Sequence, residues 1–142
     1  MLKLAENVAR DAHTGQYRRD GITPYIKHVE AVVERLHSDD EKIVGWLHDT
    51  VEDTDVTLQE LRELGFAAHI IEAVRLLTKT EGYDLQKYLE AIKANPLAKA
   101  VKIADMRSNL ADTPTKKQQK AKMVSFITSL KELRPCLMQA QS

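Results

Sequence analysis

The chain has 142 residues, 43% of them hydrophobic and 30% charged, which fits one domain with a buried core and makes global disorder improbable. Lysine plus arginine and aspartate plus glutamate each number 21, and this zero formal net charge argues against a surface that coats DNA or RNA but not against a small nucleotide ligand. The N-terminus lacks the apolar core of a signal peptide, no stretch is apolar enough to span a bilayer, and a single cysteine, Cys136, excludes an internal disulfide, so we expect one cytoplasmic domain over residues 1–142.

Apolar residues recur every three or four positions, which predicts helices almost throughout the first half of the chain. A first helix is expected from Leu2 to His13, and a polar loop with two glycines follows it as far as Pro24. Proline suits the first turn of a helix, so a second helix is expected from there to Leu36. The sequence from Ser38 to Glu41 has the form of a capping box and predicts a third helix that continues through Val51.

The same signals predict the helices of the second half. The expected segments are Thr57 to Gly65, Phe66 to Leu77, Asp84 to Ile92, Pro96 to Leu110, and a last helix that starts at Thr115 and buries Met123, Phe126, Ile127, Leu130 and Leu133. The predicted fold is therefore all-α, a compact bundle of seven or eight helices.

Three polar clusters interrupt the apolar pattern at positions where a core would not place them. They contain two histidines, four acidic residues and an asparagine: His28; His48, Asp49, Glu52 and Asp53; and Asp105 with Asn109. On a continuous helix, Asp49 and Glu52, His48 and Glu52, and Asp49 and Asp53 lie on one face. Clustered carboxylates repel one another unless a positive charge lies among them, and a divalent cation is the simplest candidate.

Four of these residues, His28, His48, Asp49 and Asp105, form a mixed nitrogen and oxygen ligand set, which we call the His/Asp set. Such a set suits Mn²⁺, Fe²⁺, Co²⁺ or Zn²⁺ better than Mg²⁺ or Ca²⁺. Four protein ligands leave positions on a six-coordinate metal for a water and a phosphate oxygen, and the metal lowers the pKa of that water.

Each cluster alone also has an ordinary structural interpretation. His28 could be a packed, hydrogen-bonded histidine, the His48 to Asp53 run a solvated acidic helix end, and Asp105 a partner of Lys102 in a surface ion pair. Three further histidines receive only such a structural interpretation: His13, His37 and His69.

Taken together, the clusters resemble the HD phosphohydrolase superfamily and, more narrowly, the hydrolase domain of RelA/SpoT-type alarmone enzymes. Three segments carry the resemblance: Ala12 to His28 (AHTGQYRRDGITPYIKH), Leu47 to Thr54 (LHDTVEDT) and Lys102 to Leu110 (KIADMRSNL). No nucleotide-synthetase segment accompanies them, so the chain resembles the small stand-alone alarmone hydrolases. The fold that this resemblance implies is the HD-domain helical bundle.

The resemblance also implies roles for individual residues. The His/Asp set matches the ligands of a Mn²⁺ ion, and Glu52 and Asp53 match an acidic pair that orients or deprotonates the attacking water. Asn109 matches a polar residue that fixes the substrate near the metal. Arg18 and Arg19 match a basic pair, of which one reaches phosphate and the other packs over the base. Guanidinium groups suit both tasks, although a solvated pair on a loop is the alternative.

The function that follows as an expectation is removal of the 3′-pyrophosphate from (p)ppGpp, which gives GDP or GTP and pyrophosphate. Two alternatives stay open: an HD phosphohydrolase that acts on another nucleotide, and a non-catalytic module that binds a nucleotide or a metal. The expected partner is a small-molecule nucleotide, without a nucleic acid polymer or a membrane. The sequence leaves the oligomeric state undetermined.

Overall fold

The structure, a computed structural model, describes residues 1–112, 124, 125, 127 and 128. The first 112 residues form eight helices and no strand, which confirms the predicted all-α fold class. The bounds of the helices are α1 (Leu2–Ala12), α2 (Ile26–Glu34), α3 (Asp39–Leu47), α4 (Thr50–Asp53), α5 (Leu58–Glu63), α6 (Ala68–Leu77), α7 (Leu85–Ala94) and α8 (Pro96–Asp112). None of the helices in the described ranges is long and apolar enough to cross a membrane.

Three helices begin at the polar residues that the sequence indicates. Ser38 accepts a hydrogen bond from the backbone N–H of Glu41, whose carboxylate accepts the backbone N–H of Ser38 in return, and this capping box starts α3. Thr57 starts α5 and Asp84 starts α7 by the same side-chain capping of an otherwise unpaired N–H group. These starts confirm the predicted element order.

The prediction of one continuous helix from Ser38 through Val51 is wrong, because the chain leaves the helix at His48 and Asp49 and re-enters it as α4. The carbonyl of Gly45 accepts a hydrogen bond from the His48 ring, and the carbonyl of Leu47 accepts one from the Thr50 hydroxyl. Side-chain donors of this kind compete with helical N–H groups for the last carbonyls of a helix. The break therefore falls inside the most polar motif of the chain.

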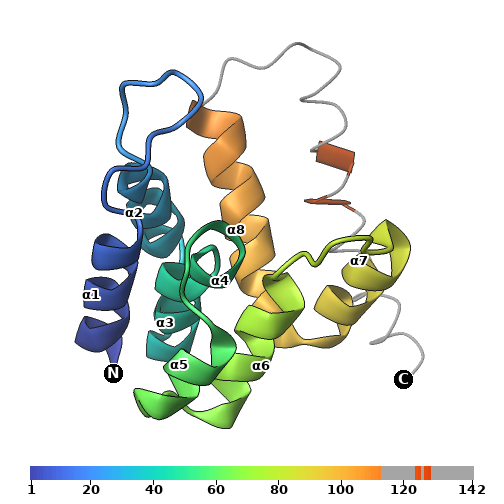
Figure 1. The fold of residues 1–142 in the computed structure, drawn as a ribbon. Helices are drawn as coiled ribbons and strands as arrows, with labels where there is room; N and C mark the ends of the chain where they lie inside the picture. The colour runs from blue at the N-terminus through green and yellow to red at the C-terminus, as the bar shows by residue number, and fades with distance from the viewer. Residues whose placement is uncertain (113–123, 126, 129–142) are drawn as a thin grey trace, which may run out of the picture.

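Helix α8 lies along the middle of the bundle and contacts α2 and α3 on one side and α6 and α7 on the other (Figure 1). Helix α1 packs on α3, away from α8. The core consists of aliphatic side chains from almost every helix; its largest fully buried members are Leu47, Leu61, Ile92, Val29, Val32, Val44, Val74 and Val101. Because α8 touches both halves of the bundle, residues on its inward face can meet side chains from α2, α3 and α6.

The loop between α1 and α2 lies beside the C-terminal end of α8 (Figure 1). This loop carries Arg18 and Arg19, so it brings two cations to the end of the helix that carries Asp105 and Asn109. Part of the last predicted helix, with Met123, Phe126, Leu130 and Leu133, lies outside the described residues, as does Cys136. Ile127, which is described, is buried as predicted.

Candidate metal centre

The His/Asp set converges at one point although its members lie up to 77 residues apart in the chain. His28 comes from α2, His48 and Asp49 from the turn between α3 and α4, and Asp105 from α8. One ligand atom from each residue can be chosen so that all four lie within 4.8 Å of one another. The four side chains therefore lie at distances that a single cation can bridge.

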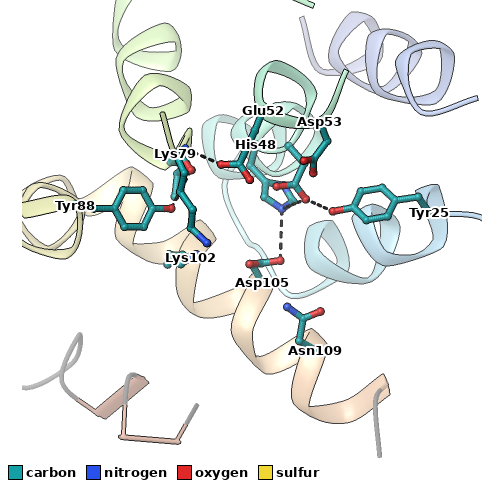
Figure 2. A pocket seen from close by; sticks show the side chains of 11 residues that line it. Tyr25, His48, Glu52, Asp53, Lys79, Tyr88, Lys102, Asp105 and Asn109 are labelled. Atoms are coloured by element: carbon teal, nitrogen blue, oxygen red, sulfur yellow. Dashed lines mark hydrogen bonds and ion pairs between the residues drawn. The ribbon is translucent and has the colours of Figure 1, made fainter. Parts of the chain in front are cut away.

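The break after α3 explains how two neighbouring residues reach the same point. Consecutive residues of a regular α-helix point about 100° apart, so the turn changes the relative direction of His48 and Asp49. In the turn, His48 Nε2 lies 3.0 Å from Asp49 Oδ2 and 3.5 Å from Asp105 Oδ1 (Figure 2). Both neighbouring side chains of the turn therefore take part in the same cluster with Asp105.

The ring of His48 is oriented by its backbone contact. Its Nδ1 lies 2.6 Å from the carbonyl oxygen of Gly45 and must donate there, because a carbonyl oxygen only accepts. In the neutral imidazole the lone pair then sits on Nε2, which is buried and has no hydrogen-bond partner. A lone pair that faces carboxylate oxygens requires a cation between them, and a metal ion meets this requirement.

Side-chain contacts also orient the other residues of the His/Asp set. His28 Nε2 lies 2.7 Å from Asp105 Oδ1, and the hydroxyl of Tyr25 donates to Asp49 Oδ2. Both histidines are buried, with exposed fractions of 3% and 4%. Such contacts fix the orientation of ligand side chains before any metal arrives.

The electrostatics of the centre favour positive charge between these groups. Burial opposes ionisation, but contacts from His28 and His48 outweigh it and hold the pKa of Asp105 below its usual value. Burial also opposes a charged His48, yet Asp49 and Asp105 outweigh it and raise the pKa of that imidazole. The field that favours a proton on His48 equally favours a divalent cation. The donor set and its surroundings therefore fit a metal ion.

The acidic pair lies at the edge of the same cavity, which has a volume of about 170 Å³. Glu52 Oε1 accepts a 2.6 Å hydrogen bond from the backbone N–H of Lys79 at the end of α6. Asp53 keeps its carboxylate at the cavity without that restraint (Figure 2). Burial, followed by the charges of Asp49 and Glu52, raises the pKa of Asp53. A carboxylate with a raised pKa is a stronger base than an ordinary one.

The structure separates the two arginines. Arg18 is half-buried and its Nη2 donates to Asn109 Oδ1 at 3.2 Å, and Asn109 lines the cavity one turn after Asp105. A second nitrogen of the same guanidinium, Nη1, is buried without a hydrogen-bond partner. Arg19 is exposed. An unpaired buried N–H group beside a metal centre can bind a phosphate oxygen.

Several residues of the cavity were not predicted from the sequence as site residues: Tyr25, Lys79, Tyr88 and Lys102. Tyr25 and Lys102 each precede a His/Asp residue by three positions, on α2 and α8, and this helical spacing is the signal that could have found them. Lys79 and Tyr88 have no such signal, because α6 and α7 approach the centre only in the tertiary structure. The predicted alternative of an ion pair between Lys102 and Asp105 is not seen among the described residues.

The remaining three histidines lie outside the His/Asp set. His69 Nε2 lies 2.8 Å from Asp40 on the surface, and His37 is exposed. His13 is buried, and its ring packs against Tyr25 with 4.9 Å between ring centroids while Nδ1 contacts Gln16.

No protein-family model matches the chain. Several known proteins are nevertheless similar to the chain in sequence. The guanosine-3′,5′-bis(diphosphate) 3′-pyrophosphohydrolase of Haemophilus influenzae is 39% identical over 88 residues, which cover 59% of this chain and 13% of that protein. A probable GTP pyrophosphokinase of Mycobacterium leprae is 33% identical over 138 residues, with 86% of this chain and 17% of that protein covered. The bifunctional (p)ppGpp synthase/hydrolase SpoT of Escherichia coli is 32% identical, with 77% and 17% covered.

The chain thus spans less than a fifth of the length of these relatives. A solved structure, described as a metazoan ortholog of SpoT that hydrolyzes ppGpp and plays a role in starvation responses, superposes with a TM-score of 0.73. The superposition covers 91% of this chain and 82% of that protein at 23% sequence identity. Two proteins with so few identical residues share this helical bundle, and the likeness concerns the fold.

Proposed function

This chain is a homologue of the (p)ppGpp hydrolase domain of SpoT/RelA-type enzymes, and from that premise we propose that it is a metal-dependent 3′-pyrophosphohydrolase of (p)ppGpp. The observation that carries the proposal is the convergence of His28, His48, Asp49 and Asp105 within 4.8 Å in a polar cavity beside an acidic pair. The products are pyrophosphate and GDP or GTP.

In this proposal the His/Asp set holds Mn²⁺, which is one of the divalent ions that suit a mixture of imidazole and carboxylate ligands and the one that the resemblance to the alarmone hydrolases implies. When bound, such a cation supplies Lewis acidity, which polarises a phosphoryl oxygen and makes a nearby water more acidic. The protein contributes the fixed orientation of the ligands, through the Gly45 carbonyl behind His48 and the Tyr25 hydroxyl behind Asp49.

The acidic pair, Glu52 and Asp53, orients the attacking water and accepts its proton. Asp53, whose pKa is raised by burial and by its acidic neighbours, accepts a proton from the attacking water. Glu52, held by the backbone of Lys79, orients that water. As the new bond from oxygen to phosphorus forms, the bond from phosphorus to the ribose 3′ oxygen breaks, and this oxygen takes up a proton to become a hydroxyl.

The substrate is oriented by the loop between α1 and α2. Arg18 offers its unpaired Nη1 to a phosphate oxygen and is held in place by Asn109, which also faces the cavity. Arg19, on the same loop but exposed, is assigned to the base, on whose planar face a guanidinium can stack.

The direct test is to incubate the purified full chain with Mn²⁺ and ppGpp and to measure pyrophosphate and GDP. Equal amounts of the two products are expected from the wild-type protein. Asp49→Ala is expected to release neither, while its far-ultraviolet circular dichroism stays helical. Glu34→Ala, which removes an exposed carboxylate from α2 at a distance from the cavity, is the matched control and is expected to keep full activity.

A protein that is loaded with metal but releases no pyrophosphate from ppGpp contradicts the proposed substrate. A panel of deoxynucleotides and 3′-phosphorylated nucleotides then distinguishes another hydrolase from a module that binds a nucleotide without turnover. Retained turnover in metal-free Asp49→Ala contradicts the assignment of the centre itself.

A further inference from the structure

Two lysines that the proposed reaction does not use line the cavity. Lys79 directly follows the C-cap of α6, and Lys102 lies on α8 one turn before Asp105. Figure 2 shows both on the Tyr88 side of the His/Asp set, with Tyr25 on the opposite side and Asn109 below Asp105. Arg18 donates to Asn109, so its guanidinium lies at the Asn109 end of the site, whereas the two lysines lie on the Tyr88 side.

The two ammonium groups are held by aromatic rings. Lys102 Nζ lies 5.4 Å from the centroid of the Tyr88 ring, and Lys79 Nζ lies 5.9 Å from the same ring and 5.8 Å from that of Tyr83. The Tyr88 hydroxyl donates to the backbone carbonyl of Leu77, which fixes the ring. A ring face attracts a cation without consuming its N–H donors, so both ammonium groups keep donors for a ligand.

Neither ammonium group forms an ion pair or a side-chain hydrogen bond within the described part of the chain, although four carboxylates line the same cavity. Burial lowers the pKa of Lys102 more than the charge of Asp105 raises it, and nearby Lys79 lowers it further. Two neighbouring cations repel each other, and an anion between them removes that repulsion. The four carboxylates of the cavity carry four negative charges, and a divalent cation at the His/Asp set would neutralise two of them, so an anion at the two lysines would no longer face their full charge.

We propose that Lys79 and Lys102 form a second anion subsite of this cavity, which binds the terminal phosphate of a ribose-linked pyrophosphate group. The inference rests on the proposed function and extends it: the pyrophosphate points toward Tyr88, and the nucleoside lies toward Arg18. The terminal phosphate carries the charge that two lysines can neutralise, whereas a 3′-monophosphate ends at the metal and cannot reach them. The subsite therefore selects a 3′-pyrophosphate over a 3′-monophosphate.

The test measures pyrophosphate binding by calorimetry to the full chain, at a constant free concentration of Mn²⁺. Lys102→Met, which keeps the length of the side chain but removes its charge, is expected to weaken pyrophosphate binding roughly tenfold or more, as the loss of a charge-assisted hydrogen bond does. Lys102→Arg is expected to retain most of the affinity. Lys87→Ala, an exposed lysine of α7, is the matched control and is expected to bind as the wild type does.

Two further readouts separate this role from a structural one. The affinities for Mn²⁺ and for GDP, which lacks the 3′-pyrophosphate, are expected to stay unchanged in Lys102→Met. The preference for ppGpp over the corresponding 3′-monophosphate, measured as a ratio of kcat/KM values, is expected to fall by a similar factor. If Lys102→Met does not fold, Lys79→Ala, on an exposed residue after α6, provides the same comparison.

Pyrophosphate affinity that stays within about twofold of the wild type in folded, Mn²⁺-loaded Lys79→Ala and Lys102→Met overturns the subsite, even if ppGpp is hydrolysed. If the wild-type protein binds pyrophosphate through these lysines but does not hydrolyse ppGpp, the subsite is supported and the proposed substrate is overturned.

Discussion

Tyr25 connects the second helix to the centre through a single hydroxyl group. It donates to Asp49 Oδ2, and its ring lies between those of His13 and His28. Burial and the charge of Asp49 raise the pKa of Tyr25, so the hydroxyl keeps its proton and acts only as a donor. Its role is to position a ligand rather than to react.

Tyr25→Phe is expected to weaken metal binding roughly tenfold, the lower end of the range for lost contacts to ligand side chains, while the fold is retained. The reason is that Asp49 loses the contact that fixes its carboxylate. Titration of the metal-free protein with Mn²⁺ measures the effect. Tyr17→Phe, on an exposed tyrosine of the preceding loop, is the control, and equal affinities in the two variants would contradict this role.

Asp20 organises the loop that carries Arg18. Its carboxylate accepts hydrogen bonds from the backbone N–H groups of Ile22 and Thr23 and from the Thr23 hydroxyl. The Thr23 hydroxyl, followed by the two N–H groups, lowers the pKa of Asp20 from 3.8 to about 2. Because the pKa of the folded state lies below the unfolded value, the contribution to stability is present above pH 3.8 and is lost as the pH falls toward 2.

A carboxyl-carbon NMR titration is expected to show Asp20 with a midpoint near pH 2. Asp20→Asn is expected to loosen the loop, because an amide accepts these bonds less strongly, and so to weaken nucleotide binding without changing metal affinity. A midpoint near the ordinary value of 3.8 would show that the carboxylate does not hold the loop.

Helices α2 and α3 pack closely at Gly45. A Cβ atom added there would lie 2.6 Å from Leu36 Cδ1 and 3.2 Å from Val33 Cγ2. Helix propensity favours alanine over glycine by about 1 kcal/mol, but overpacking of a buried contact costs about 1–3 kcal/mol. The packing cost prevails because both neighbours are themselves buried in the core.

Gly45→Ala is therefore expected to lower the free energy of unfolding by about 1 kcal/mol, measured by denaturation with urea. It is also expected to weaken Mn²⁺ binding, because a wider spacing between α2 and α3 separates His28 from His48. Lys42→Ala, outside this contact on the same helix, is the control. A variant more stable than the wild type would mean that Leu36 moves aside without cost.

On the scale of the whole molecule, the residues of the His/Asp set come from α2, from the turn after α3 and from α8, three segments that separate when the chain unfolds. A cation that binds only the folded state stabilises it by about 2.7 kcal/mol at a hundred times its dissociation constant. The melting temperature is then expected to rise by several degrees with Mn²⁺ and to return with a chelator. Asp49→Ala serves as the negative control, and an equal rise in that variant would contradict a cation at this centre.

The helices and their order follow from local information. Capping residues such as Ser38, Thr57 and Asp84 act within one turn, and the apolar period is a property of neighbouring residues, so both can be read from the chain. The identity of the His/Asp set could also be predicted, because imidazoles and carboxylates at apolar positions of helices need a reason to be there.

Other features depend on contacts that no local pattern contains. The turn at His48 and Asp49 is fixed by side-chain bonds to carbonyls of α3, and the separation of Arg18 from Arg19 depends on where Asn109 of α8 lies. Lys79 and Tyr88 reach the cavity only because α6 and α7 pack against α8. The sequence by itself determined which donor groups are available for a metal and a phosphate, since that depends on residue types. Only the tertiary structure decided which side chains surround the His/Asp set, because distances between remote segments are set by how helices pack.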